Sequence, residues 1–502
     1  MESLASGTRG APPPTVAERA APPRPHVVLV ASPGAGHLIP MAELARRLVA
    51  DNALAATLVT FTADVSAPDA RAAALASLRD AGVATAALPA VPLDDVPADA
   101  RIETVLLELI RRSAPHLRAL LSDVSAAAAP LAALVPDFFC AALLPLAAEV
   151  GVPGYIFFPS NLSMLALLRR ALELNEGAAA AAGEYRDLPD PVPLPGGVSL
   201  RRSDLPDGFR DCTEPVFAHV LDEGRRYWTA AGLLVNTFYE LDPAGADEFK
   251  AAAEEGAFPP VYPVGPLVRS GSGEEGGASA CVDWLDRQPR GSVVYVSFGS
   301  AGALSVEQTA ELAAGLEATG HRFLWVVRMP CHAEATTCGD GDDPLAWLPE
   351  GFLERTSGRG LAVAAWAAQV RVLCHPATAA FVSHCGWNSV QESVVAGVPM
   401  LAWPLYAEQR MNAAVLSENA GVALRLGAAA GGWVSREEMA AAVREVMEGE
   451  TGRAVRWRTG ELRQAAARAW APEGSSRRAL AEVAGEWKLA AAAAAGGEAP
   501  TR

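Results

Sequence analysis

The chain has 502 residues, of which 51% are hydrophobic and 20% charged, and its length suggests two or three globular domains. A formal net charge of −17 disfavours nucleic acids and anionic membranes as partners, because both are negatively charged themselves. The seven cysteines are scattered, odd in number and without a CxxC pair, which argues against a disulfide framework and a structural zinc site.

The first 25 residues are dominated by Pro and Ala, and we expect them to form a disordered arm. They contain no apolar segment of the kind found in secretory signals. The sequence also lacks a run of about 18 apolar residues that would predict a transmembrane helix. We therefore expect a cytoplasmic location and no membrane span.

Buried strands and helices alternate through the first half of the sequence. The apolar run 26–32 predicts a buried parallel strand, the Gly-rich segment 33–40 predicts a turn, and a helix is expected from Met41. A long helix is predicted over 102–125, with a kink or a break at Pro115. Further strands are predicted over 56–62, 83–88, 132–139, 155–159 and 233–237.

The alternation restarts after a polar, Gly-rich segment. We predict a first domain over 26–266, a linker over 267–280 and a second domain over 281–490, whose last helix packs back on the first domain. Residues 491–502 are expected to form a frayed tail. The strands predicted in this half lie within 292–300, 323–327, 361–365, 380–383 and 400–403.

Both halves therefore belong to the α/β class. Buried strands that alternate with helices indicate parallel, doubly wound sheets of the Rossmann type. Capping-box patterns at Ser305 and Ser435 predict the starts of two helices in the second half. Because ligands bind outside the carboxyl ends of such strands, two facing domains would hold two ligands between them.

The segment 366–409 combines features that suit a nucleotide sugar. A predicted strand ends at Ser383 and a turn follows at Gly386, so the first backbone N–H groups of the next helix form an anion site suited to a diphosphate. Trp366 offers a flat face to a planar base, and Glu392 offers acceptors to a ribose. Taken singly, these two residues are more often a core aromatic and a solvated helix face.

This segment resembles the plant secondary-product glycosyltransferase box of the family 1 UDP-glycosyltransferases. The likeness extends from the turn with His37 to the helix with Trp487, and the stretches 348–356 and 403–412 are most similar to the hydroquinone- and monolignol-glucosylating branch. The resemblance implies the GT-B fold, in which two Rossmann-like domains face each other across a cleft. It also implies UDP-glucose as co-substrate. We further expect a monomer with no cofactor and no metal, because protein dipoles can take the place of a cation.

The resemblance further implies a role for each residue of the donor site. Trp366 stacks on uracil, Gln369 lies near uracil and ribose, and Glu392 holds the ribose hydroxyls. Glu408 and Gln409 hold the sugar, and Gln at the last box position is associated with glucose donors in the family. The diphosphate is bound by Ser300 from the other Gly-rich turn together with His384, the amide of Trp387, Asn388 and Ser389.

His37 is the candidate general base. It follows the first strand at the carboxyl edge of the sheet, and imidazole titrates near the pH at which an acceptor hydroxyl must lose its proton. A lone His is more often structural, but in the family the His of this turn is the base. Asp137 is expected to orient it, in preference to Asp123 at a helix end. The implied reaction is a single inverting step that yields a β-glucoside.

The acceptor, expected to be a small phenolic compound, is the least determined partner, because loops of the first domain would build its pocket. Each candidate for that pocket is as consistent with simple packing as with binding. These candidates are Phe138, Phe139, Phe158, Asn161, Leu162 and Tyr406.

Several alternatives stay open at this point. The chain could use another UDP-sugar, transfer to carbon or nitrogen, or bind a nucleotide sugar without catalysis. A dinucleotide oxidoreductase is disfavoured because the turn at 34–39 is not a complete GxGxxG. A glycoside hydrolase is disfavoured because no second carboxylate accompanies Asp137.

Overall fold

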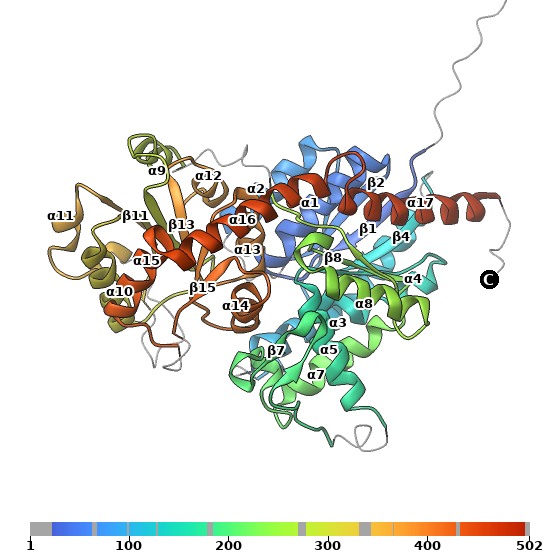
Figure 1. Ribbon diagram of the computed structural model, residues 1–502. Coiled ribbons are helices and arrows are strands. Elements are labelled where there is room, and N and C mark those ends of the chain that lie inside the picture. The colour runs from blue at the N-terminus through green and yellow to red at the C-terminus, as the bar shows by residue number, and fades with distance from the viewer. Residues whose placement is uncertain are drawn as a thin grey trace, which may run out of the picture.

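The structure is a computed structural model that describes residues 23–62, 68–97, 100–126, 129–177, 184–269, 278–330, 343–364, 366–427 and 432–496 (Figure 1). All but the last three residues of the predicted arm, and most of the predicted linker, lie outside the described residues. The described chain forms two α/β halves that lie side by side (Figure 1).

The first half contains two parallel sheets that follow one another. The first has the order β3-β2-β1-β4, with β1 (His26–Val30), β2 (Ala55–Phe61), β3 (Ala84–Leu88) and β4 (Leu131–Pro136). The second has the order β5-β8-β9, with β5 (Tyr155–Phe158), β8 (Gly232–Val235) and β9 (Val261–Pro263). Isolated parallel bridges from Leu134 to Gly154 and from Asp137 to Phe157 link the two sheets.

Helices and short elements connect these strands. The α-helices are α1 (Ala35–Asn52), α2 (Pro68–Asp80), α3 (Ile102–Ala126), α4 (Pro145–Glu149), α5 (Leu162–Leu174), α7 (Pro215–Tyr227) and α8 (Pro243–Glu254). The 3-10 helices are η1 (Phe138–Leu143), η2 (Pro195–Gly197), η3 (Arg202–Asp204), η4 (Asp207–Phe209) and η5 (Tyr239–Leu241). A small antiparallel pair is formed by β6 (Val192–Pro193) and β7 (Ser199–Leu200).

The second half is built on one parallel sheet of six strands in the order β12-β11-β10-β13-β14-β15. The strands are β10 (Val293–Ser297), β11 (Arg322–Val327), β12 (Gly360–Ala364), β13 (Thr378–Ser383), β14 (Met400–Ala402) and β15 (Ala423–Arg425). Numbered within this half the order is 3-2-1-4-5-6, that of the dinucleotide-binding fold, and it reverses between β10 and β13. The order in the first half reverses in the same way between β1 and β4.

The helices of the second half cover both faces of this sheet. They are α9 (Ala278–Leu285), α10 (Val306–Thr319), η7 (Pro344–Trp347), α11 (Phe352–Thr356), α12 (Gln369–Leu373), α13 (Trp387–Ala396), α14 (Gln409–Glu418), α15 (Arg436–Glu448), α16 (Glu450–Ala469) and α17 (Ser475–Gly496).

Successive residues of the central strands are buried in different cores. In β1, Val27 and Leu29 belong to one apolar cluster, whereas Val28 and Val30 belong to another. In β10, Val293 and Tyr295 belong to one apolar cluster, and Val294 belongs to another. Because both faces of these central strands are covered, they read as continuous apolar runs, and the predicted doubly wound α/β class is confirmed.

The last helix returns to the first half, as expected. Helix α17, red in Figure 1, lies over the first half, and its Trp487 is fully buried edge-on to Tyr155 at 5.2 Å between ring centroids. The expected fraying from residue 491 is wrong for 491–496. The helix continues to Gly496 because Ala491 is still buried in the first-half core.

Two element boundaries near the candidate base differ from prediction. Helix α1 begins at Ala35 rather than Met41, so His37 lies in the first helical turn and Pro40 lies inside the helix. The strand predicted over 132–139 ends at Pro136, because Asp137 is the N-cap of η1 and its side chain accepts a hydrogen bond from the Phe139 N–H.

Other differences are smaller. Helix α3 continues through Pro115 without a break. The strands β6, β7, β9 and β15 have no counterpart in the prediction. Ser305 and Ser435 are N-caps as expected, but each capping box is only half formed. The side chain of Gln308 bonds Val434 and that of Glu438 bonds Gly427, instead of returning to the cap.

Candidate active site

His37 and Asp137 meet where the strand order of the first half reverses. His37 follows β1 and Asp137 follows the neighbouring β4, since Val30 and Pro136 are partners in the sheet. The Nδ1–H of His37 donates to Oδ2 of Asp137 at 2.7 Å, while Oδ1 of the same carboxylate accepts the Phe139 N–H at 3.0 Å. The carboxylate therefore fixes the tautomer of the imidazole and leaves Nε2 as its basic nitrogen.

The surroundings of His37 favour its role as a base. Burial lowers the pKa of the imidazole, but the charge and hydrogen bond of Asp137 and the more distant carboxylate of Glu408 outweigh burial, so the pKa is raised. Asp137 is completely buried, whereas a fifth of the His37 side chain is exposed. The rival Asp123 has no recorded contact with His37 and lies on α3.

Aromatic side chains from η1 stack beside the imidazole. Phe138 stacks on His37 with ring centroids 5.4 Å apart and planes 13° apart, and Phe139 is tilted against it at 5.5 Å. Phe158 is only 1% exposed and meets Phe138 edge-on, so it supports this wall from the core instead of forming its surface. The neighbouring Leu162 is also fully buried in that core.

Asn161 joins the two halves. Its Oδ1 accepts the Met164 N–H and caps α5, while its Nδ2 donates to Oδ1 of Asn412 in the second half at 2.7 Å. Asn412 in turn donates to the carbonyl of Cys385 at 2.9 Å. The sequence-based placement of Asn161 in an acceptor pocket is therefore not supported, because its polar atoms already serve these contacts. Tyr406, by contrast, is 40% exposed.

His384 lies at the reversal of strand order in the second half, between two glycines. A Cβ atom on Gly299 would come within 2.5 Å of its Nε2, and one on Gly386 within 2.4 Å. The imidazole is buried, and among the described residues no hydrogen-bond partner meets its Nδ1. Burial, helped by the positive charge of Arg328, lowers the pKa of His384 to about 4, so the ring is neutral near pH 7.

The start of α13 has the open amides that the predicted anion site requires. Its N-cap, Gly386, makes no side-chain cap, which leaves the first amides of the helix to a ligand. The indole of Trp387 is buried and donates to the carbonyl of Asn236 at 2.6 Å, which leaves its backbone amide as the group that the prediction assigns to the ligand. Asn388 donates through Nδ2 to the carbonyl of Gly36 in α1 at 3.0 Å.

Gln369 connects the residues predicted for the diphosphate and the ribose. Its Nε2 lies 2.8 Å from the hydroxyl of Ser389 and 2.7 Å from a carboxylate oxygen of Glu392. Since the Ser389 oxygen accepts this bond, its own hydrogen is free to point elsewhere. Trp366 is 46% exposed, as a stacking surface must be.

The end of the box forms a tight loop before α14. Oε1 of Gln409 accepts the N–H groups of Leu405 and Tyr406 at 2.9 and 3.1 Å. Glu408 occupies the N-cap position of α14 without a side-chain capping bond, and its Oε1 accepts from Nδ2 of Asn412 at 3.4 Å. Burial raises the pKa of Glu408, and the charge of His37 opposes that shift.

Several contacts at the site were not found from the sequence. The guanidinium of Arg328 bonds the carbonyl of the exposed Ser300 and lies close enough to act on His384. Asn236 accepts from Trp387 and, at 2.7 Å, from Gln391. Residues distant in sequence make these bonds, and no local pattern in either segment marks them.

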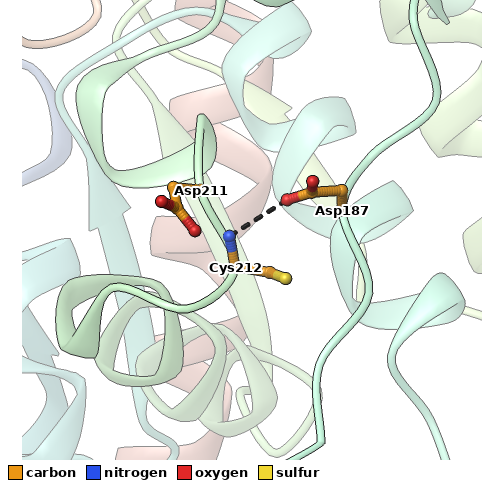
Figure 2. Close-up of side chains that lie close together, drawn as sticks. All are labelled: Asp187, Asp211 and Cys212. Atoms are coloured by element: carbon orange, nitrogen blue, oxygen red, sulfur yellow. Dashed lines mark hydrogen bonds between the residues drawn. The ribbon is translucent and has the colours of Figure 1, made fainter.

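One further group of potential metal ligands lies away from these residues. Asp187, Asp211 and Cys212 have ligand atoms within 4.8 Å of one another (Figure 2). Asp187 accepts the Cys212 N–H and pairs with Arg202, and Asp211 accepts from Thr213, so loop contacts account for the grouping.

In the part of the chain that the structure describes, no helix is both long and apolar enough to cross a membrane.

Comparisons with known proteins agree on one family. The sequence model described as UDP-glucoronosyl and UDP-glucosyl transferase matches residues 280–455. Hydroquinone glucosyltransferase of Rauvolfia serpentina is 45% identical over 469 residues, which are 92% of this chain and 98% of that protein. UDP-glycosyltransferase 72B1 of Arabidopsis thaliana is 44% identical over 92% of this chain and 96% of its own length.

Solved structures show the same relationship. A UDP-glucosyltransferase from Polygonum tinctorium, described as capable of glucosylating indoxyl and solved in complex with 3,4-dichloroaniline, has a TM-score of 0.83 and 42% identity, covering 94% of this chain and 100% of that one. UGT2 of Phytolacca americana, complexed with UDP-2fluoro-glucose and pterostilbene, has a TM-score of 0.81 and 40% identity, covering 92% and 100%. The GT-B fold implied by the resemblance is thereby confirmed.

Proposed function

The chain belongs to the family of UDP-glucuronosyl and UDP-glucosyl transferases, and on that basis we propose that it transfers glucose from UDP-glucose to a hydroxyl of a small phenolic acceptor. The transfer inverts the anomeric centre and gives a β-glucoside. The enzyme is thus a UDP-glycosyltransferase.

The observation that carries this proposal is the closeness of the two half-sites. The pair His37–Asp137 lies in the first turn of α1 and at the end of β4, and the anion site lies at the start of α13. The bond from Asn388 to Gly36 joins α13 to the turn that holds His37. A donor held by α13 is therefore presented to the base, which a protein that only binds a nucleotide sugar would not need.

In the proposed step, Nε2 of His37 takes the proton of the acceptor hydroxyl, and Asp137 stabilises the imidazolium that forms. The acceptor oxygen forms a bond to the anomeric carbon while the bond from that carbon to the diphosphate breaks. The electron pair stays on the departing UDP, whose charge is met by the amides at the start of α13 and by His384. As proposed, these donors suffice and the step uses neither a metal ion nor a cofactor.

The remaining donor contacts are proposed from the family resemblance. We assign Trp366 to uracil, Glu392 to the ribose, and Glu408 with Gln409 to the glucose. Since Oε1 of Gln409 already accepts two backbone N–H groups, this residue offers the sugar its Nε2–H donors. Ser300, Asn388 and Ser389 complete the assignment at the diphosphate.

A flat aromatic acceptor fits the wall beside the base. Phe138 and Phe139 lie against His37, so a phenol stacked on them would bring its hydroxyl near Nε2. The relatives support this class, since one is named for hydroquinone and one structure holds pterostilbene. One chain supplies both half-sites, and we propose that it acts as a monomer in the cytoplasm.

Transfer to nitrogen is the second candidate activity. It is favoured by the structure of the Polygonum tinctorium relative, which is a complex with 3,4-dichloroaniline, an aromatic amine. The same base and donor site would serve, because an aniline also loses a proton as it attacks.

The test is a product screen with the purified full chain. UDP-glucose is supplied with hydroquinone, a monolignol, a flavonoid and 3,4-dichloroaniline, and products are detected by mass and assigned as α or β by proton NMR. We expect β-glucosides of the phenols from the wild type and almost none from His37→Ala. UDP binding without any product from the wild type would support the non-catalytic alternative instead.

A further inference from the structure

The loop between β14 and α14 has three consecutive N–H groups that are each held by a side chain. Gln409 accepts those of Leu405 and Tyr406, as described above. The third, that of Ala407, donates at 2.8 Å to Oδ2 of Asp207, which belongs to the first half. The loop that precedes Glu408 is therefore held from within by one side chain and from the other domain by another.

Ala407 is the strained point of this loop. Its φ is 53°, in the left-handed region that residues other than glycine rarely adopt. The next two residues, Glu408 and Gln409, are those assigned to the glucose. A change in the backbone angles of Ala407 would rotate the chain directly before Glu408 and Gln409. The hydrogen bond to the Ala407 amide therefore also fixes the orientation of these two residues.

Asp207 also makes ion pairs with two arginines. Its Oδ1 accepts from the guanidinium of Arg410, in the first turn of α14, at 3.2 Å. The guanidinium of Arg210 approaches the same oxygen at 3.3 Å from the first half. Two cations on one carboxylate oxygen leave the other oxygen aimed at the loop.

We propose that Asp207 is a positioning residue for the sugar half of the donor site, which it shapes through Ala407 and Arg410 without touching the sugar. The inference rests on the proposed function, because it takes Glu408 and Gln409 as the residues that hold glucose. It also links sugar binding to domain contact, because Asp207 reaches the loop only while the two halves are together.

The test compares UDP-glucose with UDP. UDP has no sugar, so loss of Asp207 should weaken UDP-glucose binding while leaving UDP binding almost unchanged. We expect Asp207→Ala to raise the KM and the calorimetric Kd for UDP-glucose about five- to tenfold, the size expected when a partly exposed hydrogen bond to a charged acceptor is lost. The inhibition constant of UDP should stay within about twofold, since its contacts are made elsewhere.

Two variants separate the hydrogen bond from the ion pair. Asp207→Asn keeps an oxygen for the Ala407 amide and should restore most of the affinity for UDP-glucose. Arg410→Gln removes only the ion pair between Arg410 and Asp207, and should weaken UDP-glucose binding less than Asp207→Ala does. Asp204→Asn is the matched control. Asp204 pairs with Arg425 across the same interface but makes no recorded contact with the loop, so this variant should not alter the ratio of the two affinities.

The proposal is overturned if Asp207→Ala binds UDP-glucose like the wild type, or if UDP and UDP-glucose weaken equally, which would indicate domain docking in general. If Asp207→Ala does not fold, Asp207→Ser, whose hydroxyl is too short to bridge both partners, takes its place. Because calorimetry needs no turnover, failure of the proposed transfer would show in the wild-type product screen and not in this comparison.

Discussion

The side-chain amide of Asn388 donates to the main-chain carbonyl of Gly36 at 3.0 Å. In a regular helix this carbonyl would accept the N–H of the residue four positions later, which is Pro40 and has none. The proline inside α1 thus leaves a carbonyl of the His37 turn available to α13, the helix that we assign to the diphosphate. A local defect in one domain becomes the point at which the other domain attaches.

Replacing Pro40 by Ala should stabilise the protein and slow the reaction. Ala restores the helical N–H, which competes with Asn388 for the Gly36 carbonyl, and a proline inside a helix costs up to about 3 kcal/mol relative to Ala. Because Pro40 is buried and some packing is lost, we expect a net gain of about 1 kcal/mol in the free energy of unfolding and a fall in kcat of about tenfold. Thermal denaturation and steady-state kinetics measure the two. A variant with lower stability and full activity would contradict this reading.

The pH dependence of transfer should follow His37. The base must be neutral, so kcat/KM with a weakly acidic phenol should rise with pH through a pKa above the ordinary value of 6.5. The contribution of His37 to the free energy of unfolding changes with pH in the opposite direction. A raised pKa in the folded state adds stability below the unfolded pKa, and this contribution is lost as pH rises through the folded value.

Asp137→Asn should shift that acidic limb to lower pH, because the carboxylate that raises the pKa of His37 is removed. The plateau should also fall by about 10²–10⁴-fold, since an amide no longer enforces the required tautomer. pH–rate profiles of both proteins provide the measurement. An unshifted limb in Asp137→Asn would show that another group titrates.

Gly299→Ala should abolish most UDP binding. The added Cβ would lie 2.5 Å from Nε2 of His384. The φ of 78° at position 299 would add strain of about 1–2 kcal/mol for alanine. Gly291→Ala is the matched control, because Gly291 has a φ of 63° but open space around its Cβ position. Calorimetric titration with UDP should show a loss in the first variant only, and equal affinities would mean that His384 does not contact the nucleotide.

Trp366→Ala should weaken UDP binding about tenfold or more, the usual contribution of a base stacked on an aromatic ring, with little change in stability. Trp366→Tyr should recover part of the affinity. Trp457→Ala in α16, where the indole is 72% exposed, should leave UDP affinity as it is. Unchanged affinity in Trp366→Ala would remove this residue from the uracil site.

The placement of the residues assigned to the donor could be predicted because their geometry is local. One strand, one turn and one helix start place His384, Asn388 and Ser389 at the same sheet edge, and the residue types follow from the charge of a diphosphate. His37 and Asp137 were also found, since both follow adjacent strands of a parallel sheet. Their elements were less well predicted, because Asp137 ends its strand by capping η1.

Contacts between distant segments could not be predicted in this way. Asn161 lies among aromatic residues, which indicated a pocket, but its partner Asn412 is 251 residues away. Asp207 and Ala407 are 200 residues apart, and neither segment has a pattern that marks the bond. Such pairs depend on how two finished domains dock, which periodicity and spacing within one domain do not describe.

The return of α17 to the first half has a consequence for how the chain is made. Trp487 and Ala491 complete an apolar core whose other members begin with Val27 in β1. During synthesis, part of the apolar surface of the first-half sheet therefore stays exposed until nearly the whole polypeptide has left the ribosome. Its folding is tied to the end of translation, and a chain that stops before Ser475 would expose that surface to aggregation.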